Sequence, residues 1–342
     1  MRHSIGILAV CSVTVTAMLS GCAQPQTAAA PQPYVWQTLS GEPTRVIAHR
    51  GANGQLPEHT IEAYTLAIEQ GADVIEPDLV LTSDGVFVVR HDRYLSDSTD
   101  VADHPEFADR RHVEGGRDDW WVNDFTFDEI RTLRARQVRD GRSKEFDGLY
   151  LIPTFEEVLD LAAAHSVLIE PEVKSPSEFI AAGLDPMPEL VRILRERGLD
   201  TADAPVAVQC FEPAFLSRLN DEIDTPLLML VFQMQELDPD VDPLVPTVAL
   251  EDMVGFADGV GPYKLLLVDS EGQDTGFIAR AHELGLEVHP WTFRDDDPVG
   301  DGADIETELR RIYALGADAI FTDFPATGVR VRDAMIAEGQ PE

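Results

Sequence analysis

Short apolar runs alternate along this chain with segments whose apolar residues recur at helical spacing. The first apolar run covers residues 46–48, a second covers residues 74–75, and both break into polar residues. Between them, residues 60–70 carry apolar side chains three and four positions apart, with Thr60 expected as the N-cap and Gly71 as the end. The pattern predicts a strand, a helix and a second strand in succession.

The same alternation continues towards the C-terminus. Further strands are expected to begin near Val167, Val206, Leu227, Gly259, Glu287 and Ala319. Further helices are expected over residues 154–164, 215–220, 247–256, 277–284 and 305–315. The resulting eight strands predict an α/β fold, a (β/α)8 TIM barrel with its site at the C-terminal ends of the strands. An open doubly wound sheet is the alternative, but no glycine-rich phosphate loop opens a helix in this sequence.

A hairpin and a polar stretch interrupt the alternation after the second strand. The Asp-Gly pair at residues 84–85 is a turn signal between the apolar runs 79–81 and 86–89, which predicts a β-hairpin. Residues 93–150 are rich in Asp and Arg and depart from the barrel pattern, with one candidate helix at residues 128–136. The predicted barrel is therefore distorted at this point.

The N-terminus has the pattern of an exported protein. Arg2 precedes an apolar stretch over residues 5–18, which is too short to span a membrane but suits the core of a signal peptide. The sequence Leu-Ser-Gly-Cys at residues 19–22 resembles a bacterial lipoprotein signal. We therefore predict a lipoprotein signal peptide over residues 1–21 and lipidation of Cys22, and a soluble secreted protein cut nearby is the alternative.

The segment that follows Cys22 contains little to bury. Residues 23–33 are Ala, Gln and Pro for the most part, so residues 22–43 are predicted to form a flexible tether before a barrel domain over residues 44–335. The predicted location is outside the cytoplasm, in the periplasm or at the cell surface, with the membrane contacted through the lipid anchor. Cys210 would then be the one cysteine of the mature domain without a lipid, so no disulfide within the chain is expected.

The charge of the chain restricts its partners. It has 62 acidic against 26 basic residues, a formal net charge of −36. Such a surface repels nucleic acid and anionic lipid, so no nucleic-acid partner is expected. A phosphate-bearing substrate would have to meet a local positive centre.

Three carboxylates follow or end predicted strands. Glu76 and Asp78 lie two positions apart and share a face of one strand, where two negative charges repel unless a cation lies between them. Glu172 arrives from a separate strand and completes an oxygen-rich site suited to a hard ion such as calcium or magnesium. Lys174 shares a face with Glu172 and either contacts phosphate or pairs with an acid of a neighbouring strand. The alternative for Glu76 and Asp78 is a solvated strand face.

Two histidines are expected beside these carboxylates. His49 ends the first strand, and the hairpin returns His91 and Asp92 to the level of Glu76. Two imidazoles that flank an oxygen-ligated metal suit acid and base roles around a phosphate, with Arg50 as a source of positive charge. The alternative for His91 and Asp92 is a simple turn pair.

Several motifs carry a resemblance to a known family. In chain order they are H-R-G (49–51), P-E-H-T (57–60), E-P-D-L (76–79), H-D (91–92), L-S-D-S-T-D-V-A-D (95–103), P-E-V-K-S-P (171–176), V-Q-C-F (208–211), D-G-V-G-P (258–262), V-H-P-W-T (288–292) and F-T-D-F-P (321–325). Over about residues 44–330 the sequence resembles the glycerophosphodiester phosphodiesterase family, most closely its secreted bacterial branch. Many pieces in one order are more specific than H-R-G alone.

The resemblance implies roles for these residues. Glu76, Asp78 and Glu172 would hold one divalent ion, for which an extracellular setting favours calcium over magnesium. Residues 93–150 would be the family's insertion, a small cap. Its Trp120 and Trp121 either pack the cap onto the barrel, the interpretation we favour, or shape the alcohol side of the pocket. Phe211 and Trp291, at strand ends, either wall the substrate pocket or form the top layer of the core.

The implied activity is metal-dependent hydrolysis of small glycerophosphodiesters, the deacylated phospholipids, to sn-glycerol 3-phosphate and an alcohol. His49 and His91 would share the acid and base roles in either order, and either water or the neighbouring glycerol hydroxyl would attack. Two alternatives are a lysophospholipid or teichoic-acid phosphodiesterase on the same scaffold and a surface lipoprotein that binds without catalysis. A missing histidine or acid would mark the binding protein, and none of these residues is missing.

Overall fold

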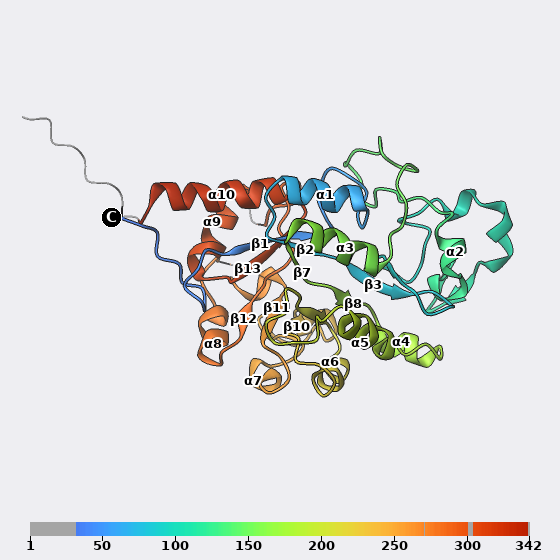
Figure 1. The fold of residues 1–342 in the computed structure, drawn as a ribbon. Helices are drawn as coiled ribbons and strands as arrows, with labels where there is room; N and C mark the ends of the chain where they lie inside the picture. Colours follow the sequence, from blue (N-terminus) through green and yellow to red (C-terminus); the bar gives the residue numbers. More distant parts are fainter. Residues whose placement is uncertain (1–31, 270, 300–303, 341–342) are drawn as a thin grey trace, which may run out of the picture.

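The computed structural model describes residues 32–269, 271–299 and 304–340 (Figure 1). The predicted signal peptide, Cys22 and most of the predicted tether lie outside these residues. Within the described ranges, no helix is long and apolar enough to cross a membrane.

Parallel strands close into a (β/α)8 barrel. Strand β1 (Arg45–His49) lies between β2 (Val74–Glu76) and β13 (Ala319–Thr322). Around the barrel from β2 follow β7 (Leu168–Ile169), β9 (Val208–Cys210), β10 (Leu227–Val231), β11 (Gly259–Pro262) and β12 (Glu287–Val288). Hydrogen bonds from the amides of Asp318 and Phe321 to the carbonyls of Val288 and Pro290 join β13 to the β12 side and complete the circle. The predicted fold class is confirmed.

Two barrel strands are split by prolines just where the carboxylates lie. Pro77 separates β2 from β3 (Asp78–Leu81), and Pro171 separates β7 from β8 (Glu172–Val173). Proline has no amide hydrogen to donate and therefore interrupts a ladder. The parallel register nevertheless continues, and it pairs His49 with Glu76 and Asp78 with Glu172.

The predicted helices around the barrel form with the expected caps. In α1 (Ile61–Glu69) the Thr60 hydroxyl accepts from the amide of Ala63, and α3 (Phe155–His165) begins with a capping box of Thr154 and Glu157. Of the other predicted helices, the structure has α6 (Pro213–Asn220), α8 (Phe277–Glu283) and α9 (Ile305–Leu315), and it adds α10 (Pro325–Glu338), which we did not predict.

Three helix predictions need correction. Between β8 and β9 lie α4 (Pro176–Ala181) and α5 (Met187–Glu196), which we did not predict although α5 buries apolar residues at helical spacing. The helix expected over 247–256 is only α7 (Leu250–Met253), since the chain turns at Gly255 with φ of 109°. The helix expected over 128–136 is only α2 (Phe127–Ile130), because the residues after it pair with other loops as isolated bridges.

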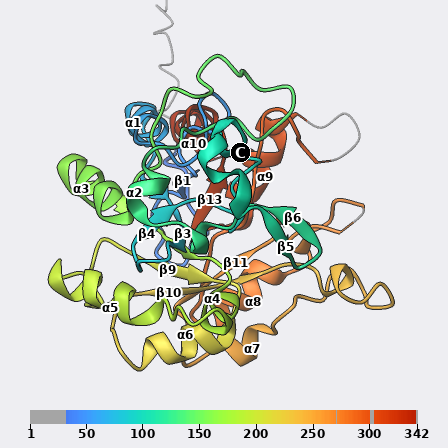
Figure 2. The same ribbon diagram turned by 90° about the vertical axis from the view of Figure 1, so that its right-hand side faces the viewer.

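The hairpin and insertion lie at the C-terminal ends of the barrel strands. Strand β3 pairs with β4 (Phe87–Val89) in antiparallel register, as predicted. The insertion holds α2 and a second hairpin, β5 (His112–Glu114) with β6 (Arg117–Asp119), and extends beyond the barrel in Figure 1 and towards the viewer in Figure 2. Trp120 and Trp121 are buried and donate their indole N–H groups to carbonyls of the insertion itself. They pack the insertion rather than line a pocket.

The predicted tether boundary at residue 43 is wrong. Trp36 is buried, and its ring lies 4.8 Å from that of Tyr34 and 6.1 Å from that of Tyr313. The part of the segment around Trp36 therefore packs on the barrel, because two aromatic side chains give it something to bury, whereas residues 39–43 are exposed.

Candidate active site

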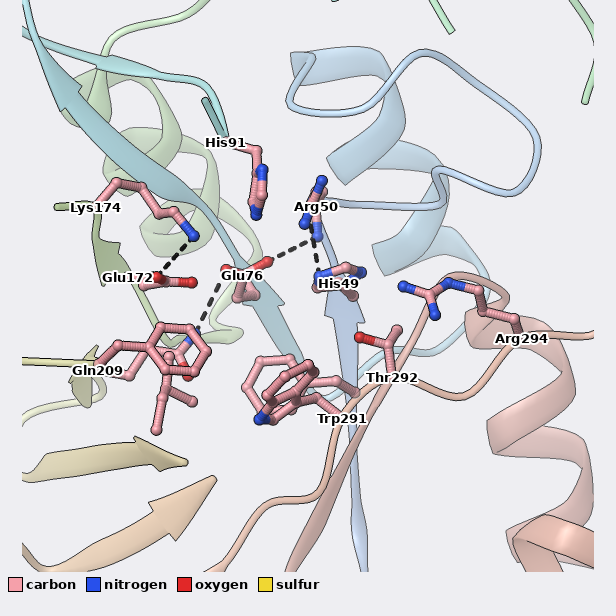
Figure 3. Close-up of a pocket in the computed structure, with 13 residues that line it drawn as sticks. His49, Arg50, Glu76, His91, Glu172, Lys174, Gln209, Trp291, Thr292 and Arg294 are labelled. Carbon is pink, nitrogen blue, oxygen red and sulfur yellow. Dashed lines mark hydrogen bonds and ion pairs between the residues drawn. The ribbon is translucent and has the colours of Figure 1, made fainter. Parts of the chain in front are cut away.

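An open pocket with a volume of about 100 Å³ lies at the C-terminal ends of the barrel strands (Figure 3). It is lined by His49, Arg50, Glu76, His91, Glu172, Lys174, Gln209, Phe211, Leu230, Trp291, Thr292, Arg294 and Phe321. Asp78 is buried beside this lining. The structure thus brings together every residue that the sequence predicted for catalysis, metal binding and substrate contact.

The three carboxylates form a cluster that fits a metal ion. One oxygen each from Glu76, Asp78 and Glu172 lies within 4.8 Å of the others, and all three side chains are buried. Among the described residues, Asp78 Oδ1 has no hydrogen-bond partner. An all-oxygen set with a bare buried oxygen suits a hard divalent cation.

The electrostatics of the cluster also favour a cation. Burial, with Asp78 adding to it, raises the pKa of Glu76 well above its ordinary value. Burial raises the pKa of Glu172 to about 8, and Asp78 again adds to the rise against the pull of Lys174. The pKa of Asp78 lies well below its ordinary value, since Lys174 and a hydrogen bond from His59 outweigh its burial. The neighbouring cations therefore do not fully compensate three negative charges.

Two cationic side chains border the carboxylates. Lys174 Nζ lies 2.8 Å from Glu172 and 3.9 Å from Asp78, so it pairs with acids of its own and the neighbouring strand and also lines the pocket. Arg50 contacts Asp78 at 3.3 Å and Glu58 at 3.0 Å, while its amide donates to Glu76. Arg50 and Lys174 are thus held in place by ion pairs with buried acids, and both side chains line the pocket.

The two histidines come from separate segments and meet the same pocket (Figure 3). His49 Nδ1 lies 2.6 Å from Asp323, and His91 Nδ1 lies 3.0 Å from Asp92. Burial and then Arg50 lower the pKa of His49 to about 4, and the same two causes lower the pKa of His91. Both imidazoles are therefore neutral near pH 7 and each has one ring nitrogen that is not paired with a carboxylate.

Phe211 and Trp291 form one wall of the pocket. Their ring centroids lie 5.7 Å apart in an edge-to-face arrangement, and the Trp291 indole donates to the carbonyl of Gly261. Tyr263 packs against Trp291 at 4.9 Å. Of the two positions that the sequence allowed for these aromatics, the structure has them in the pocket lining.

Sequence reasoning missed several residues of the site. Gln209, Thr292 and Arg294 line the pocket, and Asp323 holds His49. Gln209, Thr292 and Asp323 stand in the motifs V-Q-C-F, V-H-P-W-T and F-T-D-F-P, which we recognised without assigning them roles. The motifs were thus an available signal, whereas the contacts depend on the fold.

The comparisons with known proteins agree with this geometry. Residues 49–327 match the model of the glycerophosphoryl diester phosphodiesterase family. The chain is 33% identical to glycerophosphodiester phosphodiesterase GDPD6 of Arabidopsis thaliana (81% of this chain, 83% of the relative). It is also 33% identical to the glycerophosphodiester phosphodiesterase of Haemophilus influenzae (83% and 88%).

Solved structures extend the comparison. A protein from Silicibacter pomeroyi assigned to the glycerophosphoryl diester phosphodiesterases has a TM-score of 0.66 and 27% identity, with 85% of this chain and 94% of that chain covered. A phosphodiesterase from Oleispira antarctica, solved with its product sn-glycerol-3-phosphate, has a TM-score of 0.61 and 21% identity, with 87% and 100% covered. The second likeness concerns the fold alone.

Proposed function

Because this chain belongs to the glycerophosphoryl diester phosphodiesterase family of phosphoric diester hydrolases, we propose that it cleaves small glycerophosphodiesters to sn-glycerol 3-phosphate and an alcohol. The observation that carries the proposal is one pocket with three buried carboxylates, two histidines and two cations. The two relatives at 33% identity, both glycerophosphodiester phosphodiesterases, support the choice of substrate.

Glu76, Asp78 and Glu172 would hold one divalent ion, calcium in preference to magnesium in an extracytoplasmic setting. When bound there, the ion supplies positive charge that offsets the charge of the phosphate oxygens. Arg50 and Lys174 add positive charge on the chain's own part and stabilise the negative charge that builds up in the transition state.

The histidines carry out the proton transfers. Each Nδ1 is bonded to a carboxylate, so Nε2 is the nitrogen that takes part in the transfer; in His49 this nitrogen accepts a hydrogen bond from Arg50 Nε at 3.2 Å. One imidazole takes the proton of the attacking hydroxyl. The other, protonated when the anionic substrate raises its pKa, gives its proton to the leaving alkoxide oxygen.

We also propose that the protein is a lipoprotein outside the cytoplasm, anchored at Cys22. The proposal is supported by the apolar segment and the Leu-Ser-Gly-Cys sequence. Radiolabelled palmitate should be incorporated into the chain in bacterial cells and not into the Cys22→Ala variant; equal labelling of the two would contradict it.

The proposed activity is tested by the release of glycerol 3-phosphate from glycerophosphocholine by the purified chain. We expect release to stop with EDTA and to return when calcium or magnesium is added. A folded protein that releases no product with either ion would contradict the proposal, and release that EDTA does not affect would contradict the metal.

A further inference from the structure

The environment of His49 includes a residue to which neither the motifs nor the family match assigns a role. Asp323, just after β13, is almost fully buried, with its side chain 1% exposed. Its Oδ1 lies 2.6 Å from His49 Nδ1 and accepts from Asn53 Nδ2 at 2.9 Å. A buried carboxylate with this contact fixes how the imidazole ring is oriented.

The second oxygen of Asp323 is bound by guanidinium groups from two other segments. Oδ2 accepts from Arg142 Nη2 at 2.7 Å and from Arg294 Nε at 2.8 Å. The hydrogen bond from His49 and the charges of Arg294 and Arg142 outweigh burial and hold the pKa of Asp323 well below its ordinary value. An ionised carboxylate only accepts, so the proton between the two residues lies on His49 Nδ1.

Arg142 belongs to the insertion, and its position there is unusual for an arginine. Its side chain is 3% exposed and its donors are saturated by Asp323, by Asp296 at 2.8 and 3.1 Å, and by the side-chain oxygen of Asn53. Gln137, also in the insertion, donates to the carbonyl of Asn53 at 2.8 Å. The insertion therefore forms hydrogen bonds both to the loop that follows His49 and to Asp323, the carboxylate that orients the His49 ring.

We propose that Asp323 is the positioning residue that keeps His49 in the Nδ1–H tautomer, with Nε2 facing the pocket, and that Arg142 couples the insertion to this arrangement. The expected effect on turnover rests on the proposed function, whereas the role of Asp323 in setting the His49 tautomer does not. His91 offers the contrast: its partner Asp92 is 30% exposed and adjacent in sequence, so that pair is formed locally.

Kinetics test the proposal through a separation of kcat from KM. Asp323→Asn keeps size and shape, and we expect a fall in kcat of at least about 100-fold with KM changed less than about 3-fold, the pattern of a lost tautomer. Asp323→Glu should restore part of the activity. Arg142→Gln should lower kcat by about 10-fold, a smaller effect, because Arg142 contacts Asp323 and not the His49 ring itself. The control Arg136→Gln removes an insertion arginine whose ion pair with Asp103 is on the surface, and kcat should not change.

Nitrogen NMR of the histidine side chains tests the tautomer without turnover. The His49 signals are assigned from the His49→Gln variant. We expect Nδ1 to carry the proton in the purified full chain and the Nδ1–H population to fall in Asp323→Asn. An unchanged tautomer, or an unchanged kcat in a folded Asp323→Asn, would overturn the proposal. If Asp323→Asn does not fold, Arg142→Gln supplies the same two measurements. A wild-type chain that cleaves no glycerophosphodiester would defeat the proposed function, while the spectra would still decide the role of Asp323.

Discussion

The two ends of the barrel each hold acids and a histidine, but the environments of these residues are opposite. At the N-terminal ends, His289 Nδ1 lies 3.1 Å from Glu170, and its Nε2 lies 3.1 Å from Glu287, which also pairs with Arg45. We call these four residues the N-terminal cluster. Although burial opposes it, Glu170 and Glu287 raise the pKa of His289 to about 9, whereas the pKa of His49 at the other end is lowered to about 4.

The comparison separates charged residues that stabilise the fold from charged residues that take part in the chemistry. In the N-terminal cluster two acids face two cations, and the histidine is held as a cation with both ring nitrogens bound. At the C-terminal ends Asp78 Oδ1 has no hydrogen-bond partner among the described residues, with Lys174 Nζ at 3.9 Å, and the pKa values of Glu76 and Glu172 are raised. Incomplete compensation, rather than the number of charged residues, distinguishes the active site.

Replacement of a catalytic histidine should have the largest effect. His91→Ala removes an acid or base and should lower kcat by at least about 100-fold, with the thermal midpoint almost unchanged. Steady-state release of glycerol 3-phosphate and circular dichroism measure the two quantities. Near-normal turnover in a folded variant would contradict the assignment of the chemistry to the C-terminal ends of the barrel strands.

The N-terminal cluster should affect stability through pH. The pKa of His289 is raised from 6.5 to about 9, so its stabilisation is complete below about pH 6.5 and is lost as pH rises to about 9. At 1.36 kcal/mol per pKa unit, the loss is about 3 kcal/mol at most. Urea unfolding between pH 6 and 10 should show this slope in the wild-type chain and not in His289→Gln. Equal slopes would mean that His289 is not held as a cation.

Removal of one carboxylate from the metal cluster should have an intermediate effect: it should weaken metal binding but stabilise the metal-free protein. Glu172→Gln should weaken calcium binding by at least about 10-fold, yet it should raise the thermal midpoint in EDTA because it relieves repulsion among buried acids. Calorimetric titration and thermal unfolding measure these changes. Glu196→Gln, on the exposed face of α5, is the control and should alter neither. A lower midpoint in EDTA for Glu172→Gln would contradict the electrostatic account.

The smallest effect is expected at the rim of the N-terminal cluster. The Arg45 side chain is 34% exposed, and the pair with Glu287 is accordingly screened by solvent. Arg45→Gln should cost less than about 1 kcal/mol of unfolding free energy and leave kcat unchanged. Urea unfolding and turnover of the same preparation check this, and a loss of activity would show that the two ends are coupled.

The sequence predicted those parts of the site that follow from local geometry. Strand alternation put Glu76 and Asp78 on one face, and a hairpin register returned His91 to them; the structure has both arrangements. Cap residues likewise predicted α1 and α3, because a threonine bonds to an amide only three residues away.

The rest depends on contacts between distant segments. Asp323 lies 274 residues from His49 and 181 residues from Arg142, so no spacing rule could pair them. Likewise His49 ends β1 and His289 directly follows β12, and only the closed barrel shows at which end each side chain lies. The α5 helix is different, since its periodic apolar residues were visible and were overlooked.

The most direct test of the central claim is a crystal structure of the purified chain soaked with calcium, with anomalous diffraction to locate the ion. We predict one strong peak among the carboxylate oxygens of Glu76, Asp78 and Glu172 and none in the N-terminal cluster. A peak between Glu170 and Glu287, or no peak at the three carboxylates, would contradict the claim that incomplete charge compensation marks the active site.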